Sequence, residues 1–170
     1  TLLSVAALAA MSIGVAGCAT EPKVSALQGA DISGRRDDAE TLSKLTSMAI
    51  DSAALYRETY GRATDSALKD ELSRLAAARD QAASTFQLKS QEIGVKPEEK
   101  GQPIGARERV FAKIGGAISD KNRSAAEAAF EAEKAFDQAL LDAVNNPYIN
   151  EDVKAALRSE LPKAEQDRDR

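Results

Sequence analysis

The sequence contains no histidine and no tryptophan, and Cys18 is its single cysteine. Without histidine, the chain lacks the usual imidazole base of catalysis and the imidazole ligand of many metal sites. A single cysteine excludes a disulfide within the chain. The sequence also has no glycine-rich phosphate loop and no pair of redox cysteines. We therefore expect neither catalytic residues nor a cofactor.

The overall composition favours one helical domain. The 170 residues are enough for a single domain of ordinary size, and their net charge is −4. This negative charge gives no bulk attraction to the phosphates of nucleic acid, so we do not expect a nucleic-acid partner. Alanine, leucine and charged residues with long side chains dominate, and these favour helix over strand.

The first 17 residues form an uncharged, largely apolar run that is too short for a comfortable transmembrane helix but fits the apolar region of a secretory signal. The run ends in Val15, Ala16, Gly17 and Cys18, which resembles the lipobox of bacterial lipoproteins. The resemblance implies cleavage after Gly17 and acylation of Cys18, with residues 1–17 as the signal peptide. The alternative is a plain signal peptide in which the cysteine occurs by chance.

Lipidation of Cys18 would make a membrane the first partner of the chain, because two or more acyl chains give stable anchoring. Ala19 stands where an Asp is the usual signal for retention at the inner membrane. We therefore expect anchoring to the outer membrane of a Gram-negative cell, facing the periplasm, with a possible protein partner in the envelope. Residues 18–36 are rich in small and polar residues without a sustained period, and we expect them to form a flexible tether.

Residues 37–170 show the apolar periodicity of four amphipathic helices. The first is expected at about 38–61, and the second runs from a cap at Thr64 or Asp65 to Gly94. The third is expected at 121–144, and the fourth begins at a cap at Asn150 and kinks or ends early at Pro162. A shorter amphipathic helix is expected after Pro103. This pattern predicts an all-α four-helix bundle whose last residues, 165–170, are frayed.

Several short segments resemble a bacterial family of ferritin-like four-helix proteins of unknown function that are often linked to stress responses. These segments are Ile50-Asp51, Tyr56-Arg57-Glu58, Leu75-Ala76-Ala77 with Arg79, the loop at 94–99, and residues 135–140. The resemblance covers about residues 40–165 and implies an up-down bundle. The chain departs from the family at Ala53, where a Glu is frequent, and near Arg168, where a His is common.

Three charged residues interrupt the predicted apolar faces. They are Arg79 on the second helix, Glu133 on the third and Glu160 on the fourth. Because an unpaired buried charge is costly, we expect Arg79 to pair with one or both carboxylates. Such a pair can simply fix the register of the helices, and we favour this structural role over a ligand site.

Two other functions stay open. A carboxylate metal site or oxidase would use Glu133 and Glu160, with Asp51 or Glu58 as a further ligand, although those two also fit a solvated flank. The basic, amphipathic segment 106–123 could lie on an anionic membrane or cover the end of the bundle. Our leading interpretation is a lipid-anchored helical protein of the cell envelope, with a structural, interaction or stress-response role and no catalysis.

Overall fold

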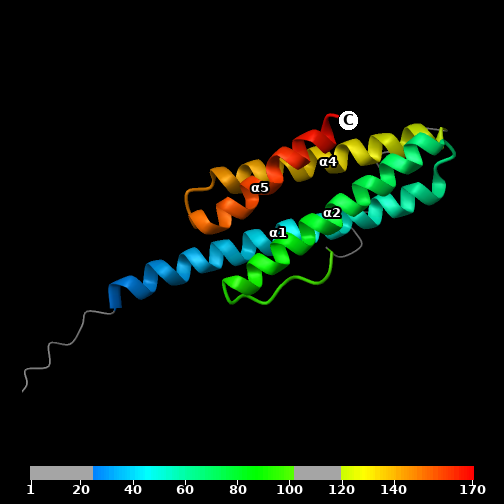
Figure 1. Ribbon diagram of the computed structural model, residues 1–170. Coiled ribbons are helices and arrows are strands. Elements are labelled where there is room, and N and C mark those ends of the chain that lie inside the picture. Colours follow the sequence, from blue (N-terminus) through cyan, green and yellow to red (C-terminus); the bar gives the residue numbers. More distant parts are fainter. Residues whose placement is uncertain (1–24, 102–119) are drawn as a thin grey trace, which may run out of the picture.

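The computed structural model describes residues 25–101 and 120–170, and all regular structure within these ranges is helical. Four helices, α1 (Ser25–Arg62), α2 (Ser66–Glu92), α4 (Lys121–Asn145) and α5 (Glu151–Arg168), pack against one another (Figure 1). The prediction of an all-α, four-helix fold is confirmed. The additional short helix predicted after Pro103 lies outside the described residues.

Local capping explains where α2 begins and ends and where α4 begins. The Asp65 side chain accepts a hydrogen bond from the backbone of Leu68 at 2.8 Å and caps α2. Gly94 follows this helix with φ of 74°, a left-handed conformation that favours glycine. Asp120 caps α4 through the backbone amides of Asn122 and Arg123.

Contacts between the helix ends fix the topology. Asn122 at the start of α4 accepts a hydrogen bond from the backbone of Thr64, in the α1–α2 turn, at 2.7 Å. Asp38 of α1 accepts hydrogen bonds from the backbone and side chain of Asn150, at 2.9 and 2.5 Å, and so satisfies the start of α5. Neighbouring helices therefore run antiparallel, and the connection from α2 to α4 returns along the length of the bundle.

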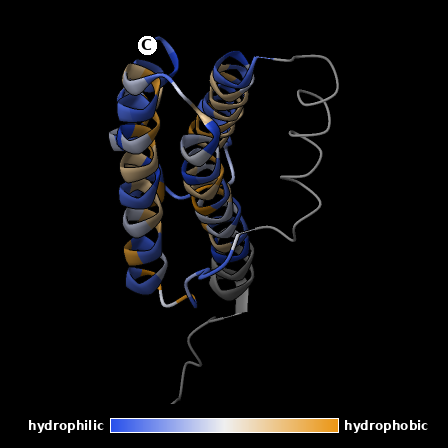
Figure 2. Cartoon of the chain, turned by 90° about the vertical axis from the view of Figure 1, so that its right-hand side faces the viewer, coloured by the Kyte–Doolittle hydropathy of each residue, from blue (hydrophilic) through white to orange (hydrophobic). Residues whose placement is uncertain are grey.

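The two hairpins, α1–α2 and α4–α5, form two facing layers (Figure 2). They meet chiefly where α1 packs on α4, with further contacts between α2 and α5. The first turns of α1 project beyond the other helices (Figure 1). This packing in antiparallel pairs is that of an up-down bundle.

The start of α1 and the end of α5 both differ from expectation. Helix α1 begins at Ser25, so the part of the predicted tether from Ser25 to Arg36 is helical instead of flexible. Helix α5 continues past Pro162 to Arg168, so neither the early end nor the fraying of residues 165–168 is correct. Pro162 is exposed, whereas Ala164 and Asp167 beyond it are buried, and this burial holds the last turns of α5 in place.

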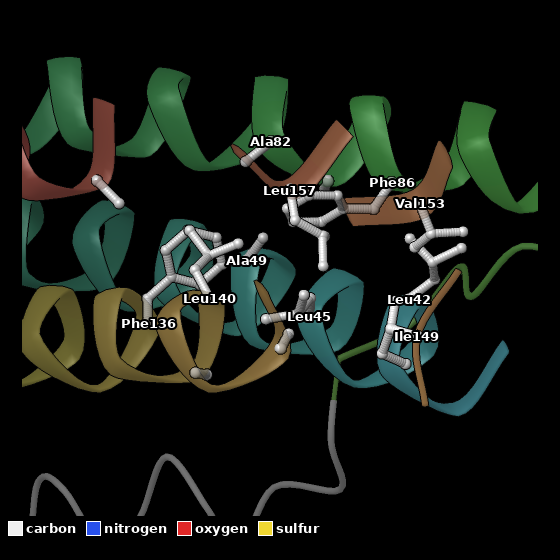
Figure 3. Packing of buried hydrophobic residues seen from close by; sticks show 14 residues of the cluster. Leu42, Leu45, Ala49, Ala82, Phe86, Phe136, Leu140, Ile149, Val153 and Leu157 are labelled. Atoms are coloured by element: carbon white, nitrogen blue, oxygen red, sulfur yellow. The ribbon is translucent and has the colours of Figure 1, made fainter. Parts of the chain in front are cut away.

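The interior contains two hydrophobic clusters. The larger one fills the half of the bundle near the α4–α5 turn and draws on all four helices (Figure 3). Its ten labelled members are Leu42, Leu45, Ala49, Ala82, Phe86, Phe136, Leu140, Ile149, Val153 and Leu157. The second cluster comes from α1, α2, α4 and the α1–α2 turn, and its buried members include no residue of α5. Each fully buried leucine or phenylalanine contributes about 2 kcal/mol through loss of apolar surface from water.

Candidate functional site

A buried polar layer separates the two hydrophobic clusters, and each helix contributes one residue to it. Its members, which we call the central polar layer, are Tyr56 on α1, Arg79 on α2, Glu133 on α4 and Asp167 on α5. Their exposed fractions are 0, 2, 1 and 9 % in that order. Four polar side chains buried this deeply require partners, because an unpaired buried charge costs several kcal/mol.

Arg79 and Glu133 form the centre of this layer. Arg79 Nε donates to Glu133 Oε1 at 3.0 Å, and Arg79 Nη2 donates to Glu133 Oε2 at 2.5 Å. This two-pronged geometry is the strongest arrangement available to an arginine and a carboxylate. The Tyr56 hydroxyl donates to Glu133 Oε1 at 2.5 Å, so the carboxylate accepts three hydrogen bonds.

Asp167 connects the centre of the layer to its edge. It accepts a hydrogen bond from Arg79 Nη2 at 2.8 Å and one from Arg74 Nη1 at 2.6 Å. Arg74 also donates twice to Glu71, and these bonds lower the pKa of the Glu71 carboxyl and raise that of the Arg74 guanidinium. The layer is thus a chain of alternating charges that runs from the interior to the surface.

Aromatic contacts complete the environment of the guanidinium. The Arg79 guanidinium carbon lies 4.3 Å from the centre of the Phe136 ring, which is one helical turn from Glu133 on the same face of α4. Burial raises the pKa of the Tyr56 phenol well above its ordinary value, and the neighbouring Glu133 carboxylate raises it further. Tyr56 therefore stays protonated and serves as a hydrogen-bond donor.

The three charged residues singled out in the sequence are all buried, but they do not all meet. Arg79 pairs with Glu133 as expected. Glu160, 4 % exposed, accepts hydrogen bonds from Lys163 at 2.8 Å and Thr85 at 3.4 Å, and has no contact with Arg79 among the described residues. Asp167, two turns further along α5, takes the place expected for Glu160. Of the two carboxylates expected as partners, one or both, Arg79 therefore pairs with Glu133 and not with Glu160.

Asp167 was missed because the last helix was expected to kink or end early at Pro162 and residues 165–170 were expected to be frayed. The signal was nevertheless present. Glu160, Ala164 and Asp167 are spaced by four and three residues and so share one helical face. Tyr56 falls on the apolar face of the first predicted helix, and a buried tyrosine hydroxyl usually finds a polar partner.

The other candidate metal ligands lie apart from this layer. Asp51 lies beside Gly101, and Glu58 is exposed and pairs with Arg62 at 2.6 Å. Within residues 25–101 and 120–170, no group of three or more acidic or cysteine side chains is placed to hold a metal ion. In the central polar layer, the positions nearest the carboxylates of Glu133 and Asp167 are occupied by the Arg79 guanidinium.

A second ion pair lies next to the central polar layer. Asp137, one turn after Glu133 on α4, pairs with Arg168 of α5. Asp137 Oδ1 is buried and has no hydrogen-bond partner in the part of the chain that the structure describes. The family resemblance implied that a common histidine is replaced near Arg168. The Arg168 guanidinium lies there opposite the buried carboxylate of Asp137.

The residues expected to carry the lipid anchor, including Cys18, lie outside the described ranges. Among the helices that are described, none is long and apolar enough to cross a membrane.

Comparison with known families assigns the chain to a helical family. Residues 37–146 match the model of a domain of unknown function, DUF2383, and the chain belongs to this family. The matched range contains three members of the central polar layer, Tyr56, Arg79 and Glu133, whereas Asp167 lies beyond it. No curated protein and no solved structure matches the chain.

Proposed function

We propose that this protein is a lipid-anchored helical bundle of the bacterial cell envelope, with a structural or interaction role, or one in stress response, and without catalysis. The proposal depends on Cys18, because the four residues Val15 to Cys18 have the lipobox pattern and follow an apolar run of suitable length. In this proposal residues 1–17 are the signal peptide, and the acylated cysteine holds the bundle at the periplasmic side of the outer membrane.

Helix α1 supports an anchored arrangement of defined geometry. From Gly34 on, where the side chains of α1 are described, the first buried residue is Asp38, whereas the helix begins at Ser25. At 1.5 Å per residue, this leading part of α1 is about 20 Å long. A lipid at Cys18 would therefore be joined to the bundle by a short linker and a helical spacer, which limits how far the bundle can move from the membrane.

The central polar layer supports a structural role for the buried charges. The Arg79 guanidinium donates to two carboxylates, and Glu133 also accepts from Tyr56. An ion pair that is hydrogen-bonded on all sides links α1, α2, α4 and α5 at one level of the bundle. This is the arrangement expected of a device that fixes helix register.

Mass spectrometry of the mature amino terminus tests the proposal. We expect the membrane-extracted protein to begin at Cys18 and to carry a diacylglycerol thioether and an amide-linked acyl chain. The Cys18→Ser variant should lose the acyl mass and leave the membrane fraction, and Ala19→Asp should move the lipoprotein toward the inner membrane. A mature chain that begins elsewhere, or an unmodified Cys18, would overturn the proposal.

A ferritin-like metal-binding protein or oxidase is the alternative function, and the topology favours it. All neighbouring helices run antiparallel with a single long connection between α2 and α4, which is the connectivity of ferritin-like bundles. Glu133 would be the first ligand to test, with Glu160 and the distant Asp51 and Glu58 as the other carboxylates. Elemental analysis of protein purified without chelators decides: stoichiometric iron or manganese that is lost in Glu133→Gln would replace our proposal.

A further inference from the structure

A cavity with a volume of about 270 Å³ lies between α2 and α4, beside the end of α5. The leucines Leu72 and Leu75 of α2 and the small Ala129 of α4 line it and are buried. Ala126 and Phe130 of α4 also line it and are exposed, Phe130 by 51 %. The inner wall of this cavity therefore belongs to the apolar interior, and its rim opens to solvent.

The cavity lies where α5 ends and its two neighbours continue (Figure 1). Asp167, in the last turn of α5, accepts hydrogen bonds from Arg74 and Arg79 of α2. Helix α5 thus ends at the level of the central polar layer, whereas α2 and α4 extend past this level to Ser66 and Lys121. The fourth helical position of the bundle is open there, and the leucines of α2 border it.

Two carboxylates of the central polar layer, Glu133 and Asp167, contribute to the wall of the cavity. Asp167 accepts one hydrogen bond on each of its oxygens, from Arg74 on Oδ1 and from Arg79 on Oδ2. Each carboxylate oxygen has room for two donors, so Asp167 can accept a further hydrogen bond from a molecule in the cavity. An apolar wall with a few polar groups is the usual form of a small-molecule site.

The charges around the cavity favour a hydrogen-bond donor over an anion as the polar end of such a molecule. An anion placed at the inner wall would lie beside the buried carboxylates of Glu133 and Asp167, and like charges repel. Two arginines, Arg168 and Arg170, also line the cavity. The Arg168 guanidinium already pairs with Asp137 and Asp169, so its charge is neutralised within the chain.

The volume of the cavity limits the size of its ligand. A cavity of about 150 Å³ lined by apolar side chains holds one benzene molecule. By this measure, a cavity of about 270 Å³ has room for a bicyclic aromatic molecule or an alkyl chain of about ten carbons.

We propose that this cavity binds a small apolar molecule that ends in a hydrogen-bond donor, such as an amine or a hydroxyl group. The apolar body lies against Leu72, Leu75 and Phe130, and the donor is accepted by Asp167. The inference requires neither lipidation of Cys18 nor a metal ion in the central polar layer.

Three naphthalene probes with the same body and different polar ends test this proposal: a naphthol, a naphthylmethylamine and a naphthoate. Isothermal titration calorimetry at neutral pH measures their binding to the full chain with Cys18→Ser, and sedimentation measures its oligomeric state. Ala126→Trp is then added to fill the cavity from its rim. Ala135→Trp, at an exposed position of α4 that does not line the cavity, is the matched control.

We expect one-to-one binding of the naphthol and the amine, and binding of the naphthoate that is weaker by about tenfold or more. Ala126→Trp should weaken the binding of both donors by a similar factor, and Ala135→Trp should leave it unchanged. Asp167→Asn should reduce the difference between the donors and the naphthoate, because it removes a negative charge from the wall.

The proposal is overturned if no probe binds or if binding is insensitive to Ala126→Trp. Tightest binding of the naphthoate would place an anion at Arg168 and Arg170 and exclude a donor ligand. A dimer that dissociates in Ala126→Trp would assign the cavity to a second copy of the chain instead.

Discussion

Replacing Arg79 by alanine should destabilise the fold strongly, because it removes the only charge partner that Glu133 has in the described structure. Glu133 would lose both bonds from the guanidinium and keep the one from Tyr56, while remaining 1 % exposed. Asp167 would suffer less, since it retains Arg74 at 2.6 Å. Removing one partner of a buried ion pair typically costs about 3–5 kcal/mol. We expect the free energy of unfolding to fall by that amount, a large share of the roughly 5–15 kcal/mol of a small domain.

Urea unfolding followed by circular dichroism measures this loss, with the slope of the transition as the check that both variants unfold in the same way. Arg57→Ala is the control. Arg57 of α1 pairs with Asp80 of α2, the residue next to Arg79, but the two side chains are 58 and 49 % exposed. Exposed pairs contribute about 0–1 kcal/mol, so this control should change stability by less than about 1 kcal/mol.

A double variant separates the ion pair from simple loss of packing. If Glu133 is destabilised by losing its partner, Arg79→Ala with Glu133→Ala should cost less than the sum of the two single variants. Equal stability losses for Arg79→Ala and Arg57→Ala would refute the reasoning. Strict additivity of the two buried substitutions would show that they act through lost volume and that the pair itself carries no coupling.

Three further predictions follow from single contacts. The pKa of Tyr56 is raised by folding, whereas in the unfolded chain it is near 10. The free energy of unfolding should therefore be constant below pH 10 with respect to this group and decrease above it, because only the unfolded chain then releases the proton. Tyr56→Phe should reduce this alkaline loss of stability, measured by urea unfolding. Asp38→Ala should cost about 1–2 kcal/mol and speed amide hydrogen exchange in the first turn of α5, because it leaves that helix start unsatisfied. Gly101→Ala should displace residues 98–101 from Asp51 and speed their proteolysis, whereas Gly61→Ala, with no neighbour in reach, should not.

Much of the fold could be predicted because its signals are local. The third and fourth helices were expected at Lys121 and after Asn150, and both begin there. The aspartate caps, the glycine after α2 and the apolar spacing each act within a few residues. Sequence alone therefore locates most helix ends, and it also identifies Arg79 and Glu133 as charges on buried faces.

The remaining features depend on contacts between distant segments. Residues 25–36 contain Gly29 and Gly34 and lack a sustained apolar period, so local propensity argues against a helix there, yet extending an existing helix requires no new nucleus. Whether Glu160 or Asp167 reaches Arg79 depends on the axial position of α5 along α2. That axial position is set by packing and by the Asp38 contact at the start of α5, neither of which is visible in the sequence of α5 itself.

The composition of α4 explains why a buried ion pair is useful in this bundle. The half of α4 that precedes Glu133 contributes Ala125, Ala128 and Ala129 to the interior. Small, equal side chains fit almost equally well after a slide of one turn, about 5.4 Å, so they select the register of α4 only weakly. Such a slide would withdraw Glu133 from Arg79 and leave the Glu133 carboxylate buried without its charge partner, at a cost of several kcal/mol. The alanine side chains of α4 allow close packing, and Glu133, which follows them, selects the register in which α4 packs.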